Sequence, residues 1–288
     1  MNPSLVVLTN LSDAAAKTAR YAAVLGAPLH AHVTLMHFYH DPLMLAPELA
    51  VVAVAQTDRS YADAATEMQA LARRLPGTAD VMVSALPMFD AVAEAVQRYH
   101  PLLLAMGLSP EHDFLDELLH NRVLPVLRAT HQPLLLVPKA ASAPRVPRRV
   151  LLALDDEPFR LDAAGQKLAP LLAAWQAAYT VTHVVDGHEP VTPPRHLALA
   201  DVRASGVVPP AATIRLYQVP DATAADGIMQ ALADTQADLV VLIARPRSFL
   251  GRRFHHSVTA EVLRRSPVPV LLIPAEATEV PDWMPAMS

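Results

Sequence analysis

The segment PVLLIP at residues 269–274 repeats, nearly letter for letter, the segment PLLLVP at residues 133–138. Each is a short apolar run enclosed by prolines, which is typical of a buried strand in a parallel sheet. The two copies lie close to half a chain length apart in a chain of 288 residues. The pair therefore predicts one folding unit that occurs twice.

Four further apolar runs precede each copy in the same order. They are residues 5–8, 33–38, 81–83 and 102–106 in the first half, and 150–154, 181–185, 214–217 and 239–243 in the second half. Segments of helix-favouring composition, such as 14–25 after a capping residue at Ser12 or Asp13, separate the runs. Strands that alternate with helices predict a parallel sheet with helices on both faces. A repeat with one local deletion favours duplication over two unrelated α/β domains.

A linker rich in proline, alanine and serine at residues 138–147 separates the two copies. We expect a first domain at residues 1–140, a second domain at 147–276 and a C-terminal tail at 277–288. Below, the first half is the chain before this linker and the second half is the chain after it.

Composition excludes several classes of protein. The 23 basic and 28 acidic residues give a formal net charge of -5, which argues against binding to a nucleic-acid backbone. The chain has 0 cysteines, so it has no disulfide, thiolate nucleophile or cysteine-ligated metal. Neither a signal peptide nor an apolar run near the ~20 residues of a membrane helix is seen. We expect a cytoplasmic protein that binds no membrane and no nucleic acid.

The second half resembles a known family. Residues 237–274, ADLVVLIARPRSFLGRRFHHSVTAEVLRRSPVPVLLIP, are similar to the C-terminal block of universal stress protein domains, and RVLLALDDE at 149–157 is similar to the family's first strand with its terminal acid. The first half resembles the family more weakly, in LVVLTNLSDAA at 5–15 and HPLLLAMGLSP at 100–110. The resemblance covers both halves and implies a tandem universal stress protein.

The resemblance implies an α/β fold with two tandem flavodoxin-like domains, similar to the adenine-nucleotide alpha-hydrolase-like sheets. Each would have five parallel strands in the order 3-2-1-4-5. In such sheets the ligand crevice lies at the carboxyl ends of the first and fourth strands, where the winding direction reverses. Family members that bind ATP carry the motif G-x2-G-x9-G-S/T from the fourth strand to the next helix. Its glycines let the backbone approach the phosphates.

The first half departs from this motif. Gly107 keeps the first glycine, but Pro110 stands at the second, and His120 and Asn121 replace the closing pair. Proline donates no N–H and its ring blocks a close approach. Asn10 replaces the acid at the end of the first strand, so a charge-assisted hydrogen bond to a ligand is lost.

The second half departs from the motif as well, because bulkier residues replace its glycines. The candidate ligand-binding residues of this half are Asp155, Ala244, Arg245, Arg247, His256 and Ser257. Asp155 keeps the acid of the first strand, and Ser257 could cap the following helix. The arginines and histidines form a basic loop that could hold a phosphate by side chains instead of backbone amides. The alternative is a loop whose charges only keep the surface solvated.

Metal and catalytic motifs are absent from the sequence. It contains no H-E-x-x-H, Walker A or G-x-S-x-G pattern. The acids at 155–157 could hold Mg²⁺ beside a phosphate, but such a run after a strand more often forms a turn and a helix cap. We therefore expect no metal and no catalytic residue, and no bound cofactor, although ATP or AMP stays an alternative.

Two classes of function remain. The first is a non-catalytic stress-response module with degenerate ATP motifs, anion or nucleotide sensing in the second half, and an unknown protein partner. Its halves would form an intramolecular pseudo-dimer through the last strands, Leu134–Val137 and Leu271–Ile273, as edge strands seek partners for their backbone groups. The alternative is an ATP-binding universal stress protein with slow ATPase or nucleotide-handling activity.

Overall fold

The computed structural model describes residues 3–38, 50–108, 126, 130–154, 159–185, 202–220, 223–244 and 258–277, of which 50–60, 183–185, 220 and 277 are described by their backbone alone. Within these residues, no helix is both long enough and apolar enough to cross a lipid bilayer.

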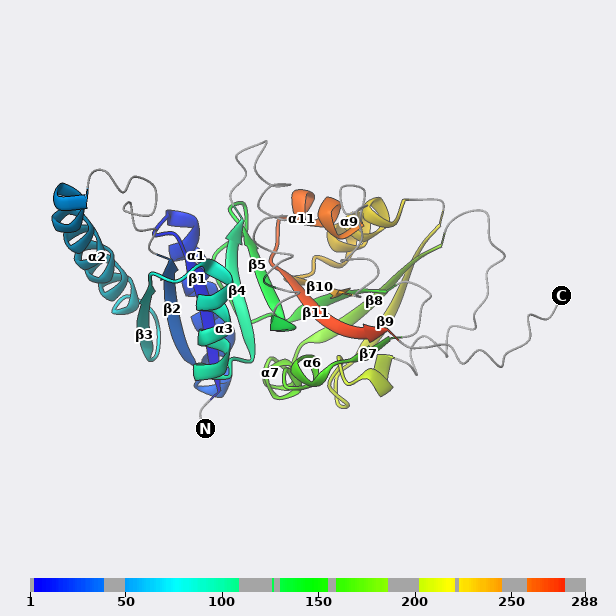
Figure 1. The fold of residues 1–288 in the computed structure, drawn as a ribbon. Coiled ribbons are helices and arrows are strands. Elements are labelled where there is room, and N and C mark those ends of the chain that lie inside the picture. Colours follow the sequence, from blue (N-terminus) through cyan, green and yellow to red (C-terminus); the bar gives the residue numbers. More distant parts are fainter. Residues whose placement is uncertain are drawn as a thin grey trace.

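Each half contributes five parallel strands to one sheet (Figure 1). The strands of the first half are β1 (Ser4–Thr9), β2 (His32–Phe38), β3 (Ala79–Ser84), β4 (Leu103–Leu108) and β5 (Leu134–Pro138). Those of the second half are β6 (Arg149–Leu154), β8 (Ala178–Val185), β9 (Ile214–Pro220), β10 (Leu239–Ala244) and β11 (Val270–Ala277), with the short β7 (Phe159–Leu161) at the side of β11.

The strand order is β3-β2-β1-β4-β5-β11-β10-β6-β8-β9. Numbered within its own half, with β7 set aside, each set of strands has the order 3-2-1-4-5. The predicted fold class is confirmed. The two sets meet where β5 pairs antiparallel with β11, and Leu135 there lies opposite Leu271.

Helices cover both faces of this sheet. They are α1 (Asp13–Gly26), the 3-10 turn η1 (Ala27–Leu29), α2 (Ala50–Ala72), α3 (Met88–Tyr99), α6 (Ala163–Gln166), α7 (Ala169–Ala174), α9 (Ala224–Thr235) and α11 (Val258–Arg265). Ser12 begins α1 because its hydroxyl accepts a hydrogen bond from the Ala15 amide at 3.3 Å, and Thr223 caps α9 in the same way.

The apolar core has two layers, one on each face of the sheet. Leu5 and Val7 belong to the layer under α1 and α7, whereas Val6 and Leu8 belong to the layer under α3, α9 and α11. This alternation follows from the two-residue period of a strand that is buried on both faces. In the second half, α9 and α11 lie on one side of the sheet and α6 and α7 on the other (Figure 1).

Two local features differ from the sequence-based expectation. The strand expected to end at Pro274 continues to Ala277, the first residue of the predicted tail, because Ala275–Ala277 pair antiparallel with β7. The connection from β6 to β8 holds β7 and two short helices, none of which the sequence pattern indicated. A strand of three residues is too short for a periodicity to be recognised.

Candidate functional site

The candidate crevice of the first half lies at the carboxyl ends of β1 and β4. These strands are parallel neighbours, and Leu8 is in register with Met106. Asn10 follows the end of β1, and Gly107 is the next to last residue of β4. The structure therefore brings Asn10 and Gly107 to the same edge of the sheet.

The side chain of Asn10 is used within its own turn. Its Oδ1 accepts hydrogen bonds from the Ser12 amide at 3.2 Å and from the Ser12 hydroxyl at 2.6 Å. The Ser12 hydroxyl in turn accepts from the Ala15 amide, so Asn10 supports the cap of α1. The oxygen that would have to accept a bond from a ligand hydroxyl is already engaged.

Gly107 is needed for the packing of α1 on β4. A Cβ at this position would lie 2.9 Å from Thr18 Oγ1 and 3.1 Å from the Ala14 carbonyl oxygen. Real Cβ atoms essentially never come as near as 2.9 Å and seldom as near as 3.1 Å, so a larger residue would require Thr18 or α1 itself to shift. Helix packing therefore explains why a glycine stands at the first position of the ATP motif, without any need for a bound nucleotide.

A histidine stands beside the end of the first strand in each half. His37 is in register with Thr9, and its Nδ1 lies 3.0 Å from the Thr9 carbonyl oxygen. His183 is in register with Leu154, the last residue of β6. The sequence analysis did not include these residues in the site, although their matching places in the repeat are a signal that could have found them.

In the second half the corresponding strand ends are Leu154 of β6 and Ala244 of β10, which are again parallel neighbours. Asp155 follows β6 directly, Arg245 follows β10, and α11 begins directly after Ser257. Ala244 is buried, with 5% of its surface exposed. The other proposed site residues of both halves lie outside the described residues; they are Asp155, Arg245, Arg247, His256, Ser257, His120 and Asn121.

In the second half a close approach of a helix to the sheet is built differently. There a helix glycine, Gly165 of α6, approaches β11, and a Cβ on it would lie 3.1 Å from Ile273 Cγ2 and 3.2 Å from the Pro274 carbonyl oxygen. The first half instead uses the strand glycine Gly107.

Arg265 fixes α11, the helix that follows the basic loop. Its Nη1 lies 2.7 Å from Asp226 Oδ1 of α9 and 2.9 Å from Glu261 Oε1. The hydrogen bonds from the Thr223 hydroxyl and from Arg265 lower the pKa of Asp226, so its carboxyl remains ionised. The last residue of α11 is thereby tied to the first turn of α9.

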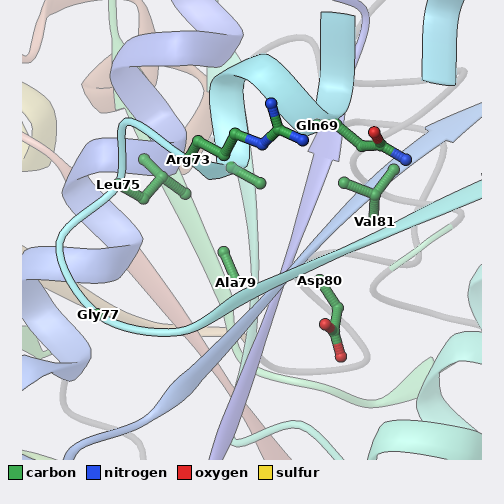
Figure 2. A pocket seen from close by; sticks show the side chains of 8 residues that line it. Gln69, Arg73, Leu75, Gly77, Ala79, Asp80 and Val81 are labelled. Atoms are coloured by element: carbon green, nitrogen blue, oxygen red, sulfur yellow. The ribbon is translucent and has the colours of Figure 1, made fainter. Parts of the chain in front are cut away.

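Two surface cavities of the described residues lie at the opposite, amino edge of the strands. One, of about 440 Å³, lies between the end of α2 and β3. Figure 2 shows Arg73 and Gln69 above it, while the carboxylate of Asp80 points away from Arg73. Asp80 instead lies 2.9 Å from His32 Nε2. The other cavity, of about 590 Å³, is lined by residues 145–149 and Asp238. Neither cavity contains a residue of the candidate crevices.

Comparison with known proteins agrees with this architecture. The profile of the universal stress protein family matches residues 217–274. A universal stress protein of Archaeoglobus fulgidus DSM 4304 is similar with a TM-score of 0.63 at 16% identity, covering 96% of this chain and 97% of that chain. A search of curated proteins finds no match.

Two proteins of Pseudomonas aeruginosa are similar over most of their length. One, of strain PAO1 and described as functionally unknown, has a TM-score of 0.51 at 14% identity and covers 94% of this chain and 92% of its own. The other, of strain UCBPP-PA14, is described as a putative universal stress protein. It has a TM-score of 0.50 at 15% identity, covering 94% of this chain and 93% of that chain. At such identities the likeness shows the fold. Residues 217–274 of the second half thus match the universal stress protein family, and the first half has the same strand order as the second half.

Proposed function

We propose that the protein is a tandem universal stress protein that acts as a non-catalytic stress-response module, and that neither crevice binds ATP in the way usual for the family. The observation that carries this proposal is the state of the first crevice. The Asn10 side chain accepts hydrogen bonds from Ser12, and α1 packs closely against Gly107. Both family positions therefore serve the internal packing of the domain.

The second half would be the ligand-responsive half. Its candidate residues Asp155, Arg245 and Arg247 follow the ends of two neighbouring strands, and His256 and Ser257 precede α11. A helix start and cationic side chains both favour an anion. We propose that this loop senses an anion or a nucleotide phosphate by side chains, with Ser257 as the helix cap.

We further propose that the two halves act together as a pseudo-dimer whose output is the binding of a protein partner. The antiparallel pairing of β5 with β11 supports this, since each strand meets the backbone groups that the other would leave unpaired at an edge. A single chain would then hold both halves at a fixed relative concentration, without a dissociation equilibrium.

The test combines mass spectrometry with hydrogen exchange on the full chain. Denatured protein should release no ATP, and titration should show no ATP binding tighter than about 1 μM. With AMP or phosphate, peptides within residues 239–265 should gain protection. Arg247→Ala and His256→Ala should each remove that protection, whereas Arg160→Ala, an exposed arginine on β7 of the same half, should leave it unchanged.

Co-purified ATP or measurable ATP hydrolysis would replace this proposal with an ATP-binding protein of slow ATPase activity. Protection that survives in both Arg247→Ala and His256→Ala would remove the idea of a side-chain anion site. Melting temperatures close to that of the parent protein would show that the substitutions left the fold intact.

A further inference from the structure

The larger of the two cavities lies where the linker enters the second half. It has a volume of about 590 Å³ and is lined by Arg145, Val146, Arg148, Arg149 and Asp238. Arg149 is the first residue of β6, and Asp238 immediately precedes β10. The cavity is thus at the amino ends of these strands, at the edge of the sheet opposite to the candidate crevice.

Asp238 fixes the shape of this cavity. Its side chain is only 4% exposed, and its Oδ1 accepts a hydrogen bond from the guanidinium of Arg145. Its Oδ2 accepts from the backbone amides of Arg148 at 2.8 Å and Arg149 at 3.0 Å. A buried carboxylate with three donors is fully satisfied, so the cavity wall is well defined and its one negative charge is already compensated.

Arg148 and Arg149 carry charge that is not compensated nearby. Among the described residues, no carboxylate lies within ion-pair distance of either guanidinium. Arg149 makes one hydrogen bond, from Nη1 to Gln236 Oε1 at 3.3 Å, and both residues are exposed. Asp238 uses only their backbone amides, so their side chains are available to a ligand.

Arg148 and Arg149 both line this cavity, and guanidinium groups are suited to binding a phosphate. Each presents a planar fork of donors that fits phosphate oxygens in pairs. The volume is that of a small-molecule pocket, and the net charge of -5 disfavours a polyanionic macromolecule. We propose that this cavity binds a phosphate group, either as inorganic phosphate or as a small phosphomonoester, with Arg148 and Arg149 as its main ligands. The site is additional to the proposed anion site in the second crevice.

A ligand here would also act on the connection between the halves. The same linker is held to α1 by Lys17, whose Nζ donates to the Lys139 carbonyl at 2.8 Å, and by the Tyr21 hydroxyl, which donates to the Ser142 carbonyl at 2.6 Å. Because both ends of the linker are anchored, a ligand bound at residues 145–149 should make local unfolding of the whole linker less frequent.

The experiment measures binding of two probes, inorganic phosphate and glycerol 3-phosphate, to the full chain at constant ionic strength. Calorimetry gives the affinity, and hydrogen exchange of peptides within residues 139–150 gives the location. Arg148→Ala/Arg149→Ala should weaken binding at least about tenfold, since a hydrogen bond to a charged group contributes roughly that much. The matched control is Arg73→Ala/Arg74→Ala, which removes the same charge from Arg73 at the other cavity and from its neighbour Arg74.

The control pair and Arg247→Ala should both leave the protection of residues 139–150 unchanged, which separates this site from the second crevice. If one probe binds more tightly than the other, the result supports the proposal and shows whether the site prefers inorganic phosphate or a phosphomonoester. Absence of protection up to about 10 mM of both probes would overturn it. Equal loss of binding in the control pair would also overturn it, because the effect would then be one of overall charge.

Discussion

Two buried tyrosines differ in whether the hydroxyl has a partner. Tyr179 is 2% exposed, and its hydroxyl has no hydrogen-bond partner in the part of the chain that the structure describes. Tyr21 is 4% exposed, and its hydroxyl donates to the Ser142 carbonyl at 2.6 Å. An unpaired buried hydroxyl costs free energy, whereas a paired one contributes to stability.

Removing the two hydroxyls should therefore have different effects on stability. Tyr179→Phe should leave the free energy of unfolding unchanged or raise it by about 1 kcal/mol, and Tyr21→Phe should lower it by about 1 kcal/mol. Urea denaturation of both variants measures the difference. A loss of stability in Tyr179→Phe as large as that in Tyr21→Phe would show that the Tyr179 hydroxyl has a partner.

The same residues predict a loss of stability at alkaline pH. Burial raises the pKa of Tyr179 and of Tyr21 above the ordinary value of 10.0. The unfolded chain thus loses these protons first, and the folded state binds more protons above about pH 10. The contribution of the two protonated tyrosines to the free energy of unfolding is fully present below that pH and is lost as the pH rises further. Between about pH 10 and 11, urea midpoints should fall less steeply in Tyr179→Phe than in the parent protein. Identical slopes would contradict the assignment.

Gly107 should be intolerant of a side chain. Gly107→Ala forces α1 away from β4 and should cost about 1–3 kcal/mol. In a Thr18→Ala background the 2.9 Å contact is gone, so the added cost of Gly107→Ala should be smaller. Denaturation of the four proteins of this cycle measures the coupling. Additive costs would show that Thr18 does not limit the space.

At the scale of elements, the carboxylate of Asp238 joins the end of the linker to the start of β6. Asp238→Ala leaves two backbone amides and the Arg145 guanidinium without their acceptor, and should cost about 3 kcal/mol. Asp238→Asn keeps an acceptor oxygen and should cost less. Asp234→Ala, an exposed acid at the end of α9, serves as the control and should cost less than about 1 kcal/mol. Equal costs at the two aspartates in thermal denaturation would refute the role given to Asp238.

For the molecule as a whole, the halves share more than a strand pair. The buried indole Nε1 of Trp175, directly after α7, donates to the Leu25 carbonyl of α1 at 2.9 Å. Both layers of the core contain residues from both halves. Such a shared core should make the two halves unfold together.

Calorimetry should accordingly show one unfolding transition for the parent protein. Trp175→Phe removes the only polar atom of that indole and leaves the buried Leu25 carbonyl without this donor, so it should lower stability by about 1–3 kcal/mol and weaken the coupling. The ratio of calorimetric to van't Hoff enthalpy should rise in the variant. Two separate transitions in the parent protein would contradict a shared core.

Much of the fold could be predicted because its signals are local. The apolar runs around Leu5–Leu8 and Val150–Leu154 mark strands by residue type alone, and the repeat places them in the same order twice. A helix cap at Ser12 or Asp13 could be predicted for the same reason, and the structure shows that Ser12 is the cap. The short β7 and the helices after it carry no periodicity, and they form because β11 and the core offer them partners.

The sequence by itself determined the duplicated α/β unit, the strand order that the family resemblance implies, and the place of Asn10 and Gly107 at the strand ends. Tertiary structure alone decided that Asn10 serves a helix cap and that Gly107 makes room for α1. It also decided that Arg145, Arg148 and Arg149 gather around Asp238. Strands and helices can be predicted from the pattern of neighbouring residues, whereas contacts such as that of Arg145 with Asp238 join residues that are distant in the chain. Only the packed fold brings those groups within hydrogen-bonding distance.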